Sequence, residues 1–406
     1  AMSALFNVPA SGHINPTLPV VTALVKRGHT VRYYNTVEFK KTITHTGAEF
    51  RAYPDSTTMA ADFVQRAGNL ATVSAFLLQT SERLLPFLQS ELSVEQPDLV
   101  IFDAIAIWGK QGALLAEIPA IASIGLFIFE GTKGILQWRD LLFQMRQALP
   151  HLPALLRSRR RLTQKYGARI FPNKALFPVV SDYNFVYTSR AFQPDTPFID
   201  NSFHFVGPSI QNTARSATDF PWQRLDPNRP HIYLSLGTIY SGKLAFYRQV
   251  LTTFADYPAQ FIVALGRDNP VDALGAIPAN FLVQPTVPQL ELLPKVDLFI
   301  THGGMNSVNE ALYYGVPLVV VPQQIEQMLN GRQAARKGAA ILLGDRPPYG
   351  NVEMAAVRGA VDTVLAEPSY RLAAQGLGDS FRAAGGYQRA ADLIEERLRA
   401  KMATAR

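Results

Sequence analysis

The chain has 406 residues, of which 48% are hydrophobic and 17% charged, with a formal net charge of +7 and no Cys. This length exceeds one ordinary hydrophobic core and predicts two domains. No apolar run reaches the about eighteen residues that a membrane helix needs, so we expect a soluble protein without an integral membrane segment. The absence of Cys excludes disulfides, thiol catalysis and sulfur-bound zinc. Since the amino terminus also lacks a secretory signal, we expect a cytoplasmic location.

Residues 1–125 alternate short apolar runs with stretches of helical periodicity, which is typical of a parallel sheet flanked by helices. The predicted strands are "ALFNV" (4–8), "TVRYYN" (30–35), "EFRAY" (49–53), "DLVIFD" (98–103) and "AIASIG" (120–125). Residues 15–28 predict a helix in which Asn15 is the cap, Pro16 takes the first helical position and Gly28 ends the helix.

Residues 130–175 are predicted to be irregular, and they contain the one concentrated basic run of the chain, "RSRRR" from Arg157 to Arg161. Elsewhere basic and acidic residues alternate. The run predicts a solvated face, with a membrane-surface or acceptor-loop role as the alternative. A nucleic-acid-binding protein would be a different explanation for the pI of about 9.5. However, the sequence contains neither a recognised nucleic-acid motif nor a basic stripe with interleaved aromatic residues, so no nucleic-acid partner is expected.

The alternation resumes after a polar, proline-bearing segment, which we take as a linker at 211–229. The predicted strands on its two sides are "NFVYTS" (184–189), "FHFVGP" (203–208), "HIYLSL" (231–236), "QFIVALG" (260–266), "NFLVQP" (280–285), "DLFITHG" (297–303), "PLVVVP" (317–322) and "AAILLG" (339–344). The predicted domains are therefore 1–210 and 230–385, both α/β with parallel sheets. A helix at 386–406 follows, for which packing back on the first domain is one arrangement. Ligands of such sheets bind beyond the carboxyl ends of the strands.

The stretch "SLGTIYSGKL" (235–244) carries Gly237, Gly242 and Lys243 at the spacing of a nucleoside-triphosphatase loop. Such a loop needs Ser or Thr directly after the Lys to bind magnesium, whereas this chain has Leu244. The match is therefore interpreted as a loop whose amides face some other anion. Ser235, Gly237 and Thr238 are the candidate contacts.

The most informative segment is "DLFITHGGMNSVNEALYYGVPLVVVPQQIEQMLN" (297–330). A predicted strand brings His302 to its carboxyl end, two glycines permit close backbone approach, and Asn306 and Ser307 open a helix. A strand, a glycine turn and a helix amino terminus together form a suitable site for a diphosphate.

The alternative interpretation is structural, because Ser307 and Glu310 have the spacing of a capping box. A cap does not explain His302. A second polar pair, Glu326 and Gln327, follows the next predicted strand at the same edge of the sheet. Polar clusters after two adjacent strands indicate one binding site.

These motifs resemble the nucleotide-sugar signature of family 1 glycosyltransferases, particularly bacterial macrolide and flavonoid glycosyltransferases. The resemblance rests on His302 to Ser307, Glu310, "GVP" (315–317) and Glu326–Gln327, and "SLGT" (235–238) and "ASGHINPTLPV" (10–20) fit in the same order. Plant members usually carry Trp where this chain has Met305 and Asp where it has Glu326, so the departures match bacterial members. The resemblance implies a GT-B fold, with two facing Rossmann-like domains of which the second holds the donor.

The resemblance also implies roles for the donor residues. His302 would contact the diphosphate beside the Gly304 turn, assisted by Asn306 and Ser307. Glu310 would bind the ribose hydroxyls, Gln289 of "VPQ" would lie near the ribose and base, and Glu326 and Gln327 would bind the sugar hydroxyls. No metal ligand set and no other cofactor is expected, since the chain contains no Asp-x-Asp and GT-B enzymes stabilise the leaving group with protein dipoles.

On the acceptor side, His13 follows the first predicted strand and Asp103 ends the fourth. Both side chains are therefore expected at the same sheet edge, where the resemblance implies a catalytic pair. A histidine suits the removal of a hydroxyl proton at neutral pH, and the carboxylate would orient the ring.

The leading interpretation is an inverting UDP-glycosyltransferase that moves a hexose, glucose first among the candidates, to a hydroxyl of a small lipophilic acceptor such as a macrolide, flavonoid or other phenolic. The stretch 126–175 would line the acceptor pocket or serve as ordinary core. Within the same fold, a membrane-associated lipid glycosyltransferase and a sugar-nucleotide epimerase are the alternatives. An epimerase would not need an acceptor base such as His13.

Overall fold

The computed structural model describes residues 1–66, 69–171, 179–211, 219–237 and 244–404, and the chain divides into two compact units. Unit 1 contains Ala1–Lys133, Leu141–Arg215 and Ala383–Arg406, and unit 2 contains Gly134–Asp140 and Ser216–Arg382. The segment Gly134–Asp140 thus lies within the range predicted as the first domain but belongs to unit 2. Its Asp140 is fully buried and pairs with Arg332 at 3.1 Å.

The sheet of unit 1 has seven parallel strands in the order β3-β2-β1-β4-β5-β6-β7. The strands are β1 (Met2–Phe6), β2 (Thr30–Asn35), β3 (Glu49–Ala52), β4 (Leu99–Asp103), β5 (Ala120–Ile124), β6 (Asn184–Val186) and β7 (Phe203–Phe205). Every predicted strand of this region is present, which confirms the α/β interpretation.

Helices cover both faces of this sheet. Successive side chains of a strand point to opposite faces, so neighbouring residues of β1 pack against different helices. Ala4 and Phe6 join the buried cluster that includes residues of α5 and α6, whereas Leu5 joins the cluster that includes residues of α2 and α15. The helices are α1 (Ser11–Ile14), α2 (Thr17–Lys26), α3 (Lys40–Thr44), α4 (Ser56–Arg66), α5 (Leu70–Glu95), α6 (Ile107–Ala116), α8 (Leu152–Tyr166) and α15 (Gly386–Thr404), with α7 (Trp138–Ala148) leading in from unit 2 and short 3-10 turns η1 (Val37–Phe39), η2 (Leu149–His151) and η3 (Ala168–Ile170).

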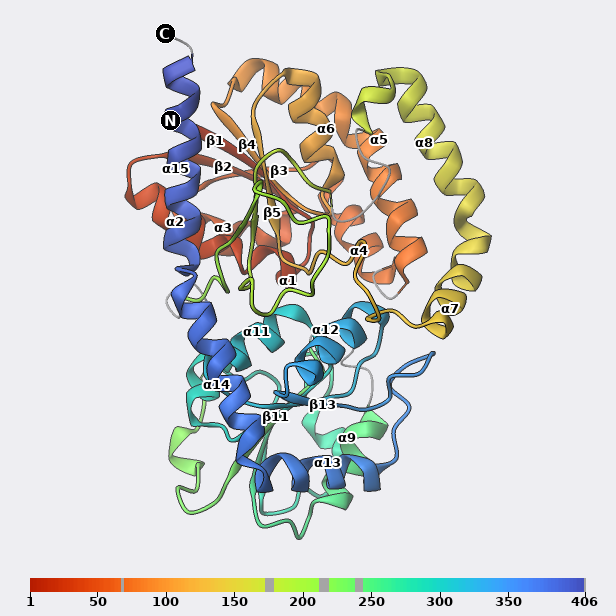
Figure 1. Cartoon of the computed structure of the whole chain (residues 1–406), viewed down its shortest axis with the longest axis vertical. Coiled ribbons are helices and arrows are strands. Elements are labelled where there is room, and N and C mark those ends of the chain that lie inside the picture. Colours follow the sequence, from red (N-terminus) through yellow and green to blue (C-terminus); the bar gives the residue numbers. More distant parts are fainter. Residues whose placement is uncertain (67–68, 172–178, 212–218, 238–243, 405–406) are drawn as a thin grey trace. The chain divides into compact units, whose positions relative to one another are not determined.

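Helix α15 follows unit 2 in sequence but packs on α2 of unit 1, as Figure 1 shows in blue beside red. Its Leu393 and Ile394 are at most 1% exposed and belong to the same cluster as Leu5. At the rim of this contact, Arg27 pairs with Asp392 at 2.7 Å. The apolar face of α15 thus completes the core of unit 1.

Two local predictions in unit 1 are wrong. Asn15 does not cap the helix that follows it, because α1 ends there and Pro16 is the residue that precedes α2. The stretch 130–175 is not irregular, since it contains α7 and α8. Pro150 and Pro153 obscure the helical pattern in the sequence, although each lies near the start of its own element, where proline is tolerated.

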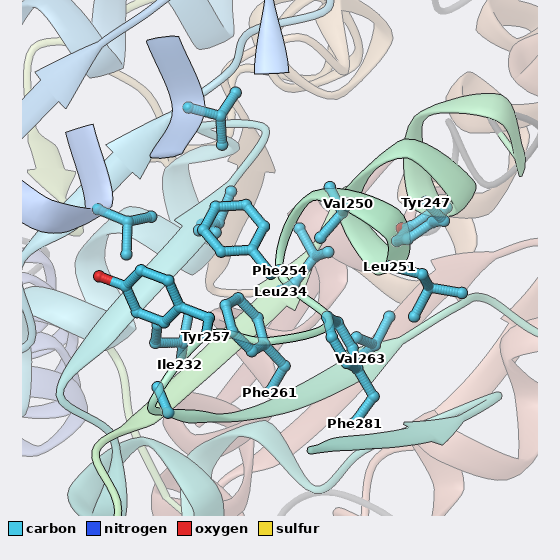
Figure 2. Close-up of a cluster of buried hydrophobic side chains, with 14 of the residues drawn as sticks. Ile232, Leu234, Tyr247, Val250, Leu251, Phe254, Tyr257, Phe261, Val263 and Phe281 are labelled. Carbon is cyan, nitrogen blue, oxygen red and sulfur yellow. The ribbon is translucent and has the colours of Figure 1, made fainter. Parts of the chain in front are cut away.

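The sheet of unit 2 has six parallel strands in the order β10-β9-β8-β11-β12-β13. The strands are β8 (His231–Ser235), β9 (Gln260–Ala264), β10 (Phe281–Gln284), β11 (Leu298–Thr301), β12 (Leu318–Val320) and β13 (Ala340–Leu342). All six were predicted. Figure 2 shows the buried cluster on one face, where Phe254 and Tyr257 contact Phe261 of β9, which stacks on Phe281 of β10.

The helices of unit 2 are α9 (Leu244–Thr253), α10 (Gln289–Leu292), α11 (Met305–Tyr313), α12 (Ile325–Arg336), α13 (Met354–Ala366) and α14 (Pro368–Ala383), with 3-10 turns η5 (Trp222–Arg224), η6 (Val271–Leu274) and η7 (Leu293–Lys295). Helix α15 confirms the helix predicted at 386–406. Among the helices described, none is at once long and apolar enough to cross a membrane.

Candidate functional site

Each sheet has one position where the strand order changes direction. In unit 1 the chain moves outward from β1 to β2 and β3 on one side and from β4 to β7 on the other; in unit 2 the corresponding neighbours are β8 and β11. Such a switch point leaves a crevice beyond the carboxyl ends of its two central strands, where open α/β sheets bind ligands. The residues that follow β1, β4, β8 and β11 are therefore the first to consider.

In unit 1 the switch point brings His13 and Asp103 together. The Nδ1 atom of His13 lies 2.9 Å from Oδ2 of Asp103. The carboxylate side chain is 3% exposed and the imidazole 23% exposed. The other carboxylate oxygen accepts the backbone N–H of Ile105 at 3.0 Å. Asp103 is thus held by the loop that follows β4, while the ring of His13 retains access to solvent.

The buried carboxylate selects the tautomer of His13. A carboxylate accepts hydrogen bonds, so Nδ1 carries the proton and donates it to Asp103. The lone pair of the neutral ring then resides on Nε2. This is the arrangement in which an imidazole takes a proton at Nε2 while a carboxylate stabilises the resulting cation.

A buried polar network that sequence reasoning missed lies beneath His13. The side-chain amide of Asn7, which is 0% exposed, donates to the backbone carbonyl of His13 and to the hydroxyl of Tyr33, both at 3.0 Å. The Tyr33 hydroxyl also meets Thr17 at 2.7 Å. Tyr53 accepts from the N–H of Asn7 and donates to its carbonyl. Asn7 therefore fixes α1, the short helix that carries His13.

In unit 2 the switch point encloses His302 between two glycines. A Cβ on Gly237 would lie 2.7 Å from the imidazole, and one on Gly304 would lie 2.6 Å from its Nε2 atom. Any side chain at either position would displace the ring. Gly237 also has a φ of 78°, which other residues rarely adopt. The two glycines are thus explained by the space that His302 occupies.

The surroundings of His302 keep its ring neutral. Desolvation of the half-buried ring lowers the pKa of His302 to about 4, and an interaction with the Ser235 backbone offsets this only in part. A neutral imidazole acts as one donor and one acceptor rather than as a cation. His302 can therefore donate a hydrogen bond to an anion at neutral pH without carrying a charge of its own.

Helix α11 begins one residue earlier than the sequence indicates, and the capping-box interpretation is wrong. Gly304 occupies the cap position and no side chain caps the helix. Asn306 and Ser307 lie half-buried in the first turn. The carboxylate of Glu310 is buried and accepts a hydrogen bond from Gln289. The amino end of α11 is thus formed by backbone amides next to His302.

The two residues predicted to meet the ribose contact each other. Nε2 of Gln289 donates to Oε2 of Glu310 at 2.6 Å, and the hydroxyl of Tyr233 donates to Oε1 of Gln289 at 3.1 Å. Gln289 is the first residue of α10, and Glu310 lies on α11. The contact brings residues of β8, α10 and α11 to one place in unit 2.

Glu326 and Gln327 lie in the first turn of α12, beside the glycine turn. Oε1 of Glu326 accepts from Asn330 at 2.7 Å, and the same Asn330 amide donates to the carbonyl of Gly303 at 3.0 Å. Oε1 of Gln327 accepts the backbone N–H of Gln323 at 2.8 Å. Asn330, which is 0% exposed, was not predicted from the sequence, and it links Glu326 to the glycine turn.

The structure describes only part of the loop 235–244, which was predicted to face an anion. Ser235 ends β8, and its hydroxyl accepts the N–H of Gly237 at 3.3 Å. Thr238, Gly242 and Lys243 lie outside the described residues. Leu244 begins α9.

Residues 126–175 include both core and exposed positions. Phe127 and Ile128 are at most 3% exposed, whereas Met145 and Leu156 on α7 and α8 are more than 60% exposed. The ordinary-core interpretation therefore holds for the start of this stretch.

In a comparison with protein families, the family described as erythromycin biosynthesis protein CIII-like, C-terminal domain, matches residues 248–394. This range contains His302, Glu310 and both members of the Glu326–Gln327 pair. It also contains Gln289.

Curated relatives and solved structures match almost the whole chain. The NDP-glycosyltransferase YjiC of Bacillus licheniformis is 34% identical, over 97% of this chain and 96% of its own. The demethyllactenocin mycarosyltransferase of Streptomyces fradiae is 32% identical, over 97% of this chain and 85% of its own. The crystal structure of the glycotransferase of kitacinnamycin superimposes with a TM-score of 0.82 at 29% identity, covering 98% of this chain and 99% of the other.

Proposed function

The chain belongs to the family 1 glycosyltransferases of GT-B fold, enzymes that transfer a sugar to natural-product acceptors, and we propose that it moves a hexose from a UDP-sugar to a hydroxyl of a small lipophilic molecule, with inversion at the anomeric carbon. The contact between His13 and Asp103 at the switch point of unit 1 carries this proposal. The donor residues of unit 2 support it.

In the proposed reaction His13 is the general base. The acceptor hydroxyl gives its proton to Nε2 as its oxygen attacks the anomeric carbon and the bond from sugar to phosphate breaks. Asp103 holds the ring through Nδ1 and stabilises the imidazolium that forms. Positioned general bases contribute about 10² to 10⁴-fold to rate. The 23% exposure of the imidazole supports this role, since a base must reach its substrate.

The leaving diphosphate would be received by the turn after β11. His302 would donate a hydrogen bond as a neutral imidazole, and the backbone amides at the start of α11 would face the same charge. Asn306 and Ser307 would add donors from the first turn of this helix. Because negative charge grows on the diphosphate as the bond breaks, such donors stabilise the transition state more than the ground state. Ser235, Gly237 and Thr238 would contribute from the loop after β8.

The remaining donor residues would hold the nucleoside and the sugar. Gln289 and Glu310 contact each other. The carboxylate of Glu310 would bind the ribose hydroxyls, and Gln289 would lie beside it near the ribose and base. Glu326 and Gln327 would bind the sugar hydroxyls, with Asn330 fixing the orientation of Glu326. Direct attack opposite the leaving group predicts a β-glycoside from an α-linked donor.

No metal is assigned a role in this proposal. Protein donors at the glycine turn would stabilise the diphosphate in place of a divalent cation, which fits the absence of an Asp-x-Asp from the chain. Transfer should therefore proceed in the presence of a chelator.

The acceptor class is proposed from the relatives, one of which is named as a mycarosyltransferase of demethyllactenocin. The test is a mass-spectrometric assay with UDP-glucose, TDP-glucose, a panel of macrolides and phenolics, and EDTA in excess. A hexose adduct formed from UDP-glucose with EDTA present, and a β-anomeric proton coupling in the isolated product, would support each part of the proposal. A requirement for Mg²⁺, an α-glycoside, or transfer only from TDP-glucose would overturn the corresponding part.

A further inference from the structure

An exposed apolar surface lies on helices that the proposed chemistry does not use. Among the described residues, fourteen large apolar side chains are exposed, and seven of them lie between positions 138 and 156. Six of these form what we call the α7–α8 face, with exposed fractions from 41% to 65%: Leu141, Leu142, Met145, Leu149, Leu152 and Leu156. Isolated exposed apolar residues are ordinary, but a concentration of this kind marks an interaction surface.

The spacing shows that the exposure is organised. From Leu142 onward, members of the α7–α8 face recur every three or four positions from α7 through η2 into α8, which is the spacing of one side of a helix. The opposite side of α8 packs on α5, as Figure 1 shows, with Ser158 and Leu162 each 1% exposed. Helix α8 is thus apolar toward the core and, in its first turns, apolar toward solvent as well.

The charges beside this face have one sign. Residues 138–169 contain eight Arg and Lys and a single acidic residue, Asp140. Asp140 is fully buried against Arg332. Arg161 pairs with Glu82, and Arg139 with Asp345. Within the described part of the chain, no ion pair involves the five other exposed bases, Arg146, Arg157, Arg160, Lys165 and Arg169.

We propose that the α7–α8 face docks on the surface of an anionic lipid bilayer. Leucine and methionine side chains would enter the boundary between headgroups and acyl chains, while the arginines would lie at the level of the lipid phosphates. Each basic residue near an anionic surface strengthens partitioning about five-fold. The positive charge beside the α7–α8 face is complementary to the anionic bilayer. The six apolar side chains would insert into the bilayer, which charge alone would not achieve.

The same charges disfavour a second copy of the chain as the occupant. A two-fold interface places each patch against its own copy, so Arg157 and Arg160 would face the same arginines across the contact. Like charges brought together across an interface oppose association. Docking on lipid has no such opposition and would place the enzyme where lipophilic acceptors concentrate. The docking proposal needs no transfer activity for its test, so either proposal can fail without the other.

The experiment is co-sedimentation of the full chain with vesicles of phosphatidylglycerol and phosphatidylcholine in about equal amounts, compared with phosphatidylcholine alone. The protein should bind the anionic vesicles, and binding should weaken as NaCl rises from about 50 to about 500 mM. The variant Leu149→Ser/Leu152→Ser/Leu156→Ser should bind at least about 10-fold more weakly. The variant Arg157→Glu/Arg160→Glu should lose about 25-fold or more.

Two matched controls exclude general effects of charge and apolarity. Lys40→Glu/Lys41→Glu changes the net charge by the same amount on α3 of the same unit, and Leu372→Ser removes a leucine that is 65% exposed on α14. Both should bind vesicles like the parent, and all variants should retain the thermal unfolding midpoint of the parent. Equal losses in the lysine control would overturn the proposal, as would unchanged vesicle binding by the leucine variant. So would a leucine variant that keeps vesicle binding but changes oligomeric state or acceptor affinity in lipid-free buffer.

Discussion

Both units place a histidine at the switch point of a parallel sheet, but the two histidines have different surroundings. His13 contacts a carboxylate that is 3% exposed, and its ring is 23% exposed. His302 is enclosed by two glycines, and burial lowers its pKa to about 4. The same topological position thus holds two different imidazoles. Asp103 orients His13 to accept a proton, whereas burial keeps His302 neutral. Position in the fold selects where a ligand binds, and the neighbours of the side chain select the chemistry.

The largest expected effect comes from removing the base. His13→Ala should lower kcat for glycosyl transfer by about 10² to 10⁴-fold while UDP affinity stays within about two-fold, because the base acts on the acceptor alone. Steady-state kinetics and calorimetric titration with UDP would measure the two quantities. His45→Ala removes an exposed histidine of the same unit and should behave like the parent. Equal loss of UDP affinity in His13→Ala would contradict the separation between the two histidines.

The next effect tests the space that His302 needs. Gly237→Ala would push a Cβ into the imidazole, and should weaken UDP binding by about 10-fold or more through the loss of a hydrogen bond to a charged group. Gly275 has the same φ of 78° but open space around it, so Gly275→Ala is a substitution at a positive φ without the collision.

Thermal unfolding and UDP titration of both glycine variants would separate strain from displacement. Both should lose stability because each has a positive φ, and only Gly237→Ala should lose nucleotide affinity. If Gly275→Ala loses as much affinity, the position of His302 is not what Gly237 protects.

Replacing either of two buried asparagines should have a smaller effect, and each of them lies beside one of the two histidines. Asn7 donates to the carbonyl of His13, and Asn330 donates to the carbonyl of Gly303. Replacing either by Leu should cost about 1–3 kcal/mol of stability, because a buried acceptor loses its partner. Asn7→Leu should lower kcat with UDP affinity kept, whereas Asn330→Leu should raise KM for the UDP-sugar. The same kinetic pattern in both variants would argue that the two asparagines only support the fold.

The smallest effect is a dependence of stability on pH. Since the pKa of His302 is lower in the folded chain than its ordinary 6.5, the unfolded chain binds the extra proton between pH 6.5 and about 4. His302 therefore reduces stability as pH falls through this window. His302→Gln, which cannot titrate there, should show a shallower fall in unfolding midpoint from pH 7 to 4.5. Parallel curves for parent and variant would rule out this contribution.

Short apolar runs predicted all thirteen strands of the described residues, because the strands of a parallel sheet are buried on both faces and are apolar almost throughout. The contact between His13 and Asp103 could also be predicted, since His13 follows β1 and Asp103 ends β4, and both strands end at the same edge of the sheet. Local capping could not: Ser307 and Glu310 have capping-box spacing, but the helix starts at Met305 and Glu310 turns to Gln289.

The networks beneath the site could not be predicted because their partners are distant in sequence. The sequence predicts Asn7 only as one residue of a strand. Its hydrogen bonds involve Tyr33 and Tyr53, which are distant in sequence and are brought to it by the fold. Helices α7 and α8 were missed for a different reason, because Pro150 and Pro153 interrupt the helical pattern where the two helices meet.

The return of α15 to unit 1 has a consequence for synthesis on the ribosome. A chain that is made from its amino end usually completes its first domain before the second. Here Leu393 and Ile394, which fill the core beneath α2, follow every residue of unit 2 in the chain. Unit 1 is therefore begun first and finished last, and the half that carries His13 waits with an open apolar face until the half that carries His302 has been translated.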